Sequence, residues 1–225
     1  MVNWKYLLQR VFVLSALLLL AACSTNRVTS TVVTPLEQQT APVVESQLLD
    51  LAVLPFEPGL ENIESDDTSV SPTVRTAEAQ YLPNQLAATG AWGAVRLVPG
   101  RETVTEVYVA GKIVASNGET LALDITVTDS SNRHWYTKSY TETVGNYAYN
   151  RQNQLQRDPF QGLYNRIAND LLEYRQQMSA ENVNKLRTIA ELRFARDFSP
   201  EAFSDHIRET PGGQLEISRL PAEND

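Results

Sequence analysis

The chain contains a single cysteine, Cys23, which ends a short apolar run near the amino terminus. A basic start with Lys5 and Arg10 precedes a nearly uninterrupted apolar stretch over residues 11–20. This stretch is shorter than the roughly 20 apolar residues that a membrane helix needs, and its length is typical of a secretory signal. Because the chain has no second cysteine, neither an internal disulfide nor a thiolate metal site can hold the fold, which must depend on packing.

Four residues at the end of this run, Leu20, Ala21, Ala22 and Cys23, resemble the lipobox of bacterial lipoproteins. In that family the thiol is linked to diacylglycerol, and a peptidase cuts just before the cysteine. The resemblance implies a signal peptide over 1–22 and a lipidated Cys23 that binds membrane lipid. Each buried acyl methylene contributes ~0.8 kcal/mol, so two or three chains would anchor the protein firmly. The alternative is a plain signal peptide with an incidental cysteine.

Residue 24 indicates the compartment, and the net charge bears on the class of partner. Ser24 follows the cysteine where lipoproteins of the inner membrane usually carry aspartate, so the resemblance implies the periplasmic face of the outer membrane. The chain has a net charge of -8, and segment 1–22 holds two basic residues and no acidic one, so its removal makes the remainder more acidic. Such a charge argues against nucleic acid as a partner.

The rest of the chain divides into a tether, a sheet region and a helical region. Residues 23–46 are rich in Thr, Val, Gln and Ser, contain no glycine and show no periodicity, which is typical of a flexible tether. We expect one domain with its sheet over 47–149, its helices over 150–209, and a terminal strand or tail over 210–225.

The first predicted elements are a strand and a helix. The segment Leu48–Phe56 is almost continuously apolar, which favours a central strand covered on both faces. A helix is predicted from Pro72, a good first helical residue, to Gly90, a plausible stop. Pro83 is expected to kink or restart this helix near Tyr81.

Four strands are predicted to follow. Leu121, Leu123, Ile125 and Val127 alternate with polar residues and give the clearest strand pattern in the chain. The pair Asn117-Gly118 predicts a two-residue hairpin, because both positions tolerate positive φ. The predicted strands cover residues 95–98, 107–115, 120–127 and 134–144.

The remainder is predicted to be mostly helical. One helix starts at Asp158-Pro159, and a short one starts at Ser199-Pro200. Between them Ser179 caps a helix whose packing stripe is Val183, Leu186, Ala190 and Phe194. A last strand is expected over 215–220. These elements predict an α/β (α+β) fold, with a mixed, mostly antiparallel sheet of about five strands packed by helices in the order β-α-β-β-β-β-α-α.

Groups that could carry catalysis are sparse. His134 lies in a predicted strand and His206 in a short terminal helix, and we interpret both as surface or packed residues. The acidic residues over 61–67 lack the alternating pattern and the glycine of a calcium loop. No phosphate-binding glycine loop or nucleophile motif is present. We therefore expect no enzyme activity, no metal and no cofactor.

Aromatic residues suggest a binding patch. If Tyr108, Tyr136 and Tyr140 share the sheet face opposite the core, they form a contact surface flanked by Lys112 and Lys138. Tyrosine-rich patches often bind partners. The alternative is that helices cover this face and the tyrosines only pack.

The element order, which opens with Leu51-Ala52-Val53-Leu54-Pro55-Phe56, resembles the small periplasmic α/β domains of several envelope proteins. These include the curli-secretion channel lipoprotein, the lipoprotein activators of penicillin-binding proteins, and the amino-terminal domain of the Tol-system propeller protein. The resemblance covers residues 48–175. The stretches 90–96, 111–113 and 116–118 are also similar to a group of proteobacterial outer-membrane lipoproteins without assigned activity.

These observations predict a non-catalytic, lipid-anchored lipoprotein that acts as an adaptor or assembly factor for another envelope protein. One alternative is a ring-forming subunit of an outer-membrane secretion or export apparatus, and self-association therefore stays open. Its pore-forming version is disfavoured, because the chain offers one long hairpin, Val104 to Val127, where the curli channel lipoprotein has two. A second alternative is an envelope hydrolase with an unrecognised site.

Overall fold

The computed structural model describes residues 33–58, 72–145 and 158–220. The predicted lipobox, the acidic residues over 61–67 and the last five residues lie outside these ranges. Within the ranges, no helix combines the length and apolarity needed to cross a membrane.

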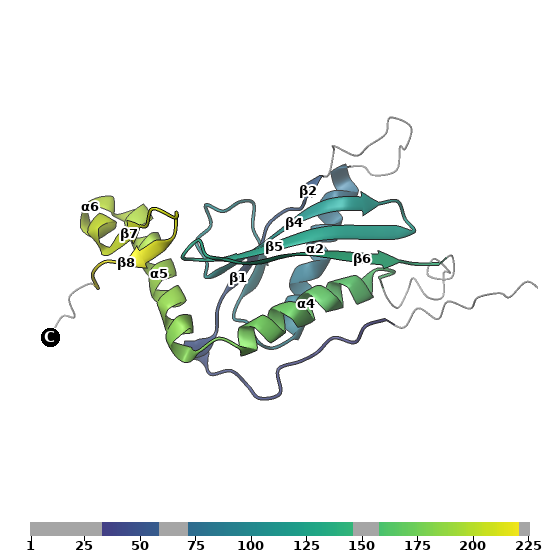
Figure 1. Cartoon of the computed structure of the whole chain (residues 1–225), viewed down its shortest axis with the longest axis horizontal. Coiled ribbons are helices and arrows are strands. Elements are labelled where there is room, and N and C mark those ends of the chain that lie inside the picture. The colour runs from purple at the N-terminus through teal and green to yellow at the C-terminus, as the bar shows by residue number, and fades with distance from the viewer. Residues whose placement is uncertain (1–32, 59–71, 146–157, 221–225) are drawn as a thin grey trace, which may run out of the picture. The chain divides into compact units, whose positions relative to one another are not determined.

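A mixed sheet forms the centre of the fold, with strand order β3-β1-β4-β5-β6 (Figure 1). β1 runs parallel to both β3 and β4, whereas β4, β5 and β6 pair antiparallel. The short β2 also pairs with β4, further along its edge. The strands are β1 (Leu51–Val53), β2 (Glu57–Pro58), β3 (Val95–Leu97), β4 (Val107–Ser116), β5 (Thr120–Asp129) and β6 (His134–Thr143). This confirms the predicted mixed, mostly antiparallel sheet of about five strands.

Burial follows the sequence pattern in the central strands. All three residues of β1 are buried, as continuous apolarity predicted, because each face of the strand is covered. In β5 every second residue is buried in the main core, and the residues between them are half-buried. The β4–β5 turn differs from the prediction, since Asn117, Gly118 and Glu119 all lie between the strands. Of these three residues only Gly118 has a positive φ, 84°, and the Asn117 side chain accepts hydrogen bonds from the backbone amides of Glu119 and Thr120.

Two helices pack on one face of the sheet. α2 (Pro72–Ala88) contributes Leu82 and Leu86 to the main core, and α4 (Gln161–Gln176) contributes an apolar stripe around Ile167. In Figure 1 both helices lie on the same side of the strands. α2 continues through Pro83, so the helix does not restart near Tyr81.

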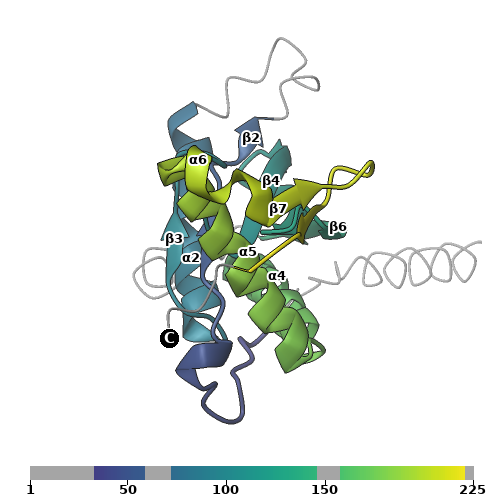
Figure 2. The same ribbon diagram turned by 90° about the vertical axis from the view of Figure 1, so that its left-hand side faces the viewer.

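The carboxyl-terminal part forms a smaller unit at one end of the sheet. α5 (Ala180–Phe198) begins after Ser179, whose hydroxyl accepts from the Asn182 amide at 3.2 Å, as predicted. After α6 (Pro200–Phe203) comes a hairpin of β7 (Ile207–Glu209) and β8 (Leu215–Ile217), seen with α5 in Figure 2. The sequence pattern predicted β8 but not its three-residue partner β7. Ile189, Leu192, Ile207 and Leu215 form the satellite core of this unit.

Part of the predicted 23–46 tether lies on the domain. We call residues 34–39 the strap, because they run along α4. Asn165 Nδ2 donates to the Thr34 carbonyl at 2.8 Å, and Asn169 Nδ2 donates to the Pro35 carbonyl at 3.0 Å. The Gln39 amide donates to a carbonyl at the end of α2. The tether is therefore fixed to the domain from residue 34 onward.

Candidate functional site

The predicted aromatic patch is divided between the two faces of the sheet. Tyr108 of β4 is only 2% exposed and belongs to a small cluster with Ala52 and Val98, on the face opposite the main core. Its hydroxyl donates to the Thr103 carbonyl at 3.1 Å. Lys112 lies on the same face and is exposed. Tyr108 therefore packs, as the alternative interpretation held, and is not available to a partner.

The other three patch residues lie on the helical face of the edge strand β6. Tyr136, Lys138 and Tyr140 are paired with Val127, Ile125 and Leu123 of β5, which point into the main core. Directly paired residues share a face. The condition for the patch, that the three tyrosines share the face opposite the core, is therefore not met.

A β-bulge causes this difference. The pairing of β5 with β6 shifts between Val127 and Thr128, so that Trp135 is an extra residue on β6. If Trp135 instead paired regularly with Val127, Tyr136 would lie opposite Thr126, and Tyr136 and Tyr140 would point to the same face as Tyr108, because a one-residue slip moves every side chain of a strand to the other face.

At the β6 edge, Lys138 and the Tyr140 hydroxyl are both paired with Asp170. Asp170 of α4 lies 2.6 Å from the Lys138 ammonium and accepts a hydrogen bond of 2.5 Å from the Tyr140 hydroxyl. Burial, and then this hydrogen bond, raise the pKa of Tyr140, so the phenol remains a donor. Two hollows of about 430 and 240 Å³ meet at Lys138 and Asp170. The two charges at this meeting point therefore neutralise each other and offer a partner little charge.

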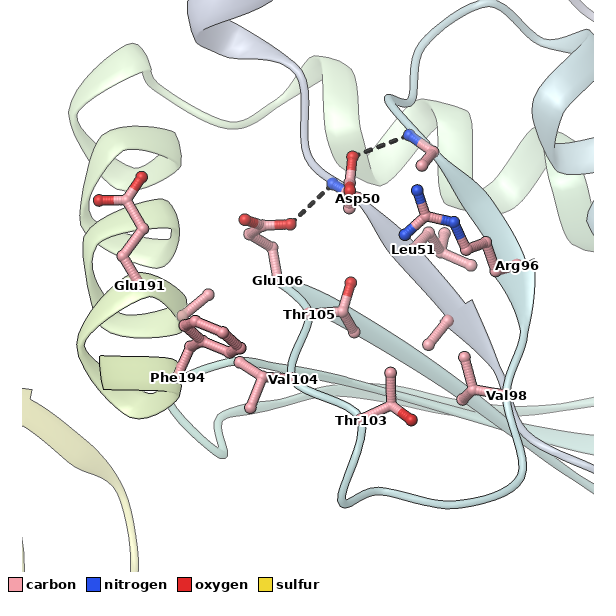
Figure 3. Close-up of a pocket in the computed structure, with 13 residues that line it drawn as sticks. Asp50, Leu51, Arg96, Val98, Thr103, Val104, Thr105, Glu106, Glu191 and Phe194 are labelled. Atoms are coloured by element: carbon pink, nitrogen blue, oxygen red, sulfur yellow. Dashed lines mark hydrogen bonds between the residues drawn. The ribbon is translucent and has the colours of Figure 1, made fainter. Parts of the chain in front are cut away.

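A different pocket lies between the start of β1 and the second half of α5 (Figure 3). It has a volume of about 220 Å³. Its lining includes Asp50, Arg96, Thr103, Glu106, Glu191 and Phe194. We call it the α5 pocket. None of its lining residues was singled out as a site from the sequence.

Two carboxylates in the α5 pocket are oriented by backbone amides. Asp50 Oδ1 accepts from the Ala94 amide, and Glu106 Oε2 accepts from the Asp50 amide, both at 2.8 Å (Figure 3). Burial raises the pKa of Glu106, opposed in part by its hydrogen bond to the Asp50 amide. Glu191 of α5 also lines the pocket, with its carboxylate directed away from Asp50 and Glu106 (Figure 3), and Arg96 is the basic residue of the lining.

The end of α5 exposes two phenylalanines. Phe194 is 64% exposed at the edge of the α5 pocket, and Phe198, one turn later, is 84% exposed. The predicted packing stripe is confirmed at Val183, Leu186 and Ala190, which are buried, and is wrong at Phe194. The apolar face of the helix thus continues beyond the residues that cover it. Phe198 follows Phe194 at helical spacing, so the sequence could have suggested that the apolar stripe extends beyond the residues that cover it.

The two histidines have local partners. His134 Nε2 lies 2.9 Å from the Thr137 hydroxyl, and the buried His206 lies with Nδ1 2.7 Å from the Arg219 carbonyl. Over the three described ranges, no group of three or more His, Cys, Asp or Glu side chains is arranged to hold a metal ion.

Comparison with known proteins gives only distant likenesses. No family model matches the chain, and no curated protein matches it. A Xanthomonas campestris protein of family DUF330 gives a TM-score of 0.40 at 14% identity, covering 63% of this chain and 90% of that one. A PelC dodecamer from Paraburkholderia phytofirmans gives 0.38 at 16% identity (58% and 92%), and a hypothetical protein from Chlamydia trachomatis 0.37 at 13% (56% and 94%). Likeness at this level transfers no function or assembly to the chain.

Proposed function

We propose that the chain is a non-catalytic lipoprotein adaptor of the bacterial envelope. Acylated Cys23 anchors it at the periplasmic face of the outer membrane, and the α/β domain binds another envelope protein. The observation that carries the binding role is the end of α5, where Phe194 and Phe198 are exposed beside a pocket. Exposed large aromatic residues that adjoin a pocket are typical of protein interfaces.

The anchor rests on the sequence Leu20-Ala21-Ala22-Cys23 and its apolar run. We expect the full chain, expressed in a bacterium with two membranes, to be processed before Cys23 and to fractionate with the outer membrane. Mass spectrometry should find the amino-terminal peptide heavier by a diacylglyceryl group. Cys23→Ala should abolish both the modification and the membrane association, and Ser24→Asp should move the protein to the inner membrane. An unmodified thiol in the wild type would contradict the anchor.

The binding role can be tested by placing a photo-crosslinking amino acid at position 198 in the full chain. We expect one predominant adduct with an envelope protein after illumination of whole cells. The matched control is position 114, where Val114 is also exposed but lies on the sheet. A ladder of adducts between copies of the chain would support the ring-forming alternative, and equal yields at both positions would contradict the adaptor role.

A further inference from the structure

We propose that the α5 pocket receives a lysine or arginine side chain of the partner, from a segment whose neighbouring apolar residues cover Phe194 and Phe198. This inference rests on the proposed adaptor function and specifies the chemistry of the partner. It joins two features that adjoin on the surface: an acidic cavity and an uncovered apolar helix end.

The first argument is the charge of the pocket. Asp50, Glu106 and Glu191 contribute three carboxylates to the lining, against the single guanidinium of Arg96. The ion pairs found among the described residues join other side chains, and none includes these three carboxylates. Even with Arg96 in the lining, and with Arg187 near enough for its charge to lower the pKa of Glu106, the three carboxylates leave the pocket with a net negative charge, which makes it complementary to a basic side chain.

The second argument is that the nearby arginines of α5 are committed elsewhere. Arg187 Nη1 donates to the Glu45 and Leu48 carbonyls at 3.0 and 2.9 Å. Arg193 Nη1 donates to the Ser130 carbonyl at 3.0 Å, and its guanidinium lies over the Tyr108 ring. Burial raises the pKa of Glu106, and a cation bound in the pocket would lower this pKa again.

The third argument excludes two other occupants of the same surface. A second copy of this chain carries the same net charge of -8, which is not complementary to an acidic pocket. An anionic lipid surface would meet the carboxylates of the α5 pocket. Both occupants would be repelled, whereas a basic, apolar segment gains from both parts of the surface.

The fixed geometry of the carboxylates supports a specific site over a diffuse acidic surface. Asp50 and Glu106 are held by successive hydrogen bonds, from the Ala94 amide to Asp50 and from the Asp50 amide to Glu106. A site whose groups are already oriented loses less conformational entropy when its ligand binds.

The experiment uses the full lipidated chain in detergent micelles, with N-acetyl-arginine amide as the probe and N-acetyl-citrulline amide as its neutral isostere. We expect the arginine probe to shift the backbone amide resonances of Asp50 and Ala94 in a saturable titration, and the citrulline probe to leave them unchanged. The double variant Glu106→Gln, Glu191→Gln should weaken arginine binding about tenfold. The matched control, Glu173→Gln on the exposed side of α4, should leave it unchanged. Equal shifts by both probes, or no effect of the double variant, would overturn the inference.

Crosslinking separates this inference from the proposed function. If the position-198 adduct forms, we expect it to decrease about tenfold in the double variant and at high salt. An adduct that forms equally well in the double variant would overturn the basic-partner inference and leave the adaptor role intact. The double variant Phe194→Ser, Phe198→Ser tests the apolar half of the proposed surface, with the crosslinker at the neighbouring position 197. Full adduct formation in this variant would contradict that half of the surface.

Discussion

At the scale of single residues, Asp129 holds the β5–β6 turn together. It is 1% exposed, and its Oδ1 accepts from the Ser131 amide, the Ser131 hydroxyl and the Arg133 amide. Its Oδ2 accepts from Trp135 Nε1 at 2.7 Å. One carboxylate thus satisfies four donors, and it positions the bulged Trp135 against Tyr174, 4.5 Å between ring centroids.

We predict that Asp129→Ala lowers the free energy of unfolding by roughly 3 kcal/mol, because it leaves buried donors of Ser131 and Trp135 without an acceptor. Urea denaturation followed by tryptophan fluorescence measures this loss. The matched control is Asp197→Ala, at an exposed position beside Arg196, which should change stability by less than about 0.5 kcal/mol. A loss below about 1 kcal/mol for Asp129→Ala would show that the turn holds without its carboxylate.

At the scale of elements, the strap is fixed by two amides at one-turn spacing on α4. Asn165 and Asn169 each donate to a strap carbonyl, and Asn169 Oδ1 also accepts from the Glu37 amide at 2.9 Å. Leu36 of the strap packs against the main core. The backbone groups of an extended segment need hydrogen-bond partners. For the strap, side chains of α4 supply the hydrogen bonds that a neighbouring strand would otherwise provide.

We predict that Asn165→Ala combined with Asn169→Ala releases the strap while the sheet remains folded. The free energy that holds the strap on α4 should fall by about 1.5–4.5 kcal/mol, since the variant removes three hydrogen bonds that each contribute roughly 0.5–1.5 kcal/mol. Limited proteolysis should cut the variant within residues 34–47 several times faster than the wild type. As a control, the Gln177→Ala variant, changed at the exposed residue just after α4, should be cut at the wild-type rate. Unchanged cleavage in the double variant would mean that Leu36 and the hydrogen bonds of Gln39 are enough to hold the strap.

The elements that depend on local pattern could be predicted from the sequence. Alternation in β5, the cap at Ser179 and the Ser199-Pro200 helix start are local signals, and the structure has all three. The faces of β6 could not be predicted, because one bulged residue at Trp135 reverses them. The exposure of Phe194 could not be predicted either, since helical periodicity gives a stripe but not where its cover ends. The lipid anchor at Cys23 stays a prediction.

At the scale of the whole domain, the β5–β6 turn joins the sheet to the carboxyl-terminal unit. The Ser130 hydroxyl donates to the Leu186 carbonyl of α5 at 2.7 Å, and the Leu215 amide of β8 donates to the Ser131 carbonyl at 2.8 Å. The main core contains residues of the sheet, α2, α4 and the first half of α5 (Val183 and Leu186), whereas the satellite core has only four buried side chains. Stability should therefore be uneven across the domain.

We predict that Leu215→Ala opens the satellite core without unfolding the sheet. Native-state hydrogen exchange should show the amides of β7 and β8 losing protection by about 2–4 kcal/mol, while those of β5 remain at the wild-type value. Leu123→Ala is the matched control, because it removes the same side chain from the main core and should lower protection throughout. Equal effects of both variants on β5 would show that the domain unfolds as one unit.

Attachment of the strap to α4 also sets how far the domain can travel from its anchor. If Cys23 carries the lipid, only nine residues lie between it and residue 33, the residue just before the strap. A chain of this length spans at most about 35 Å when fully extended. The domain would then stay within this distance of the bilayer, and any partner that it binds would have to come equally close to the membrane.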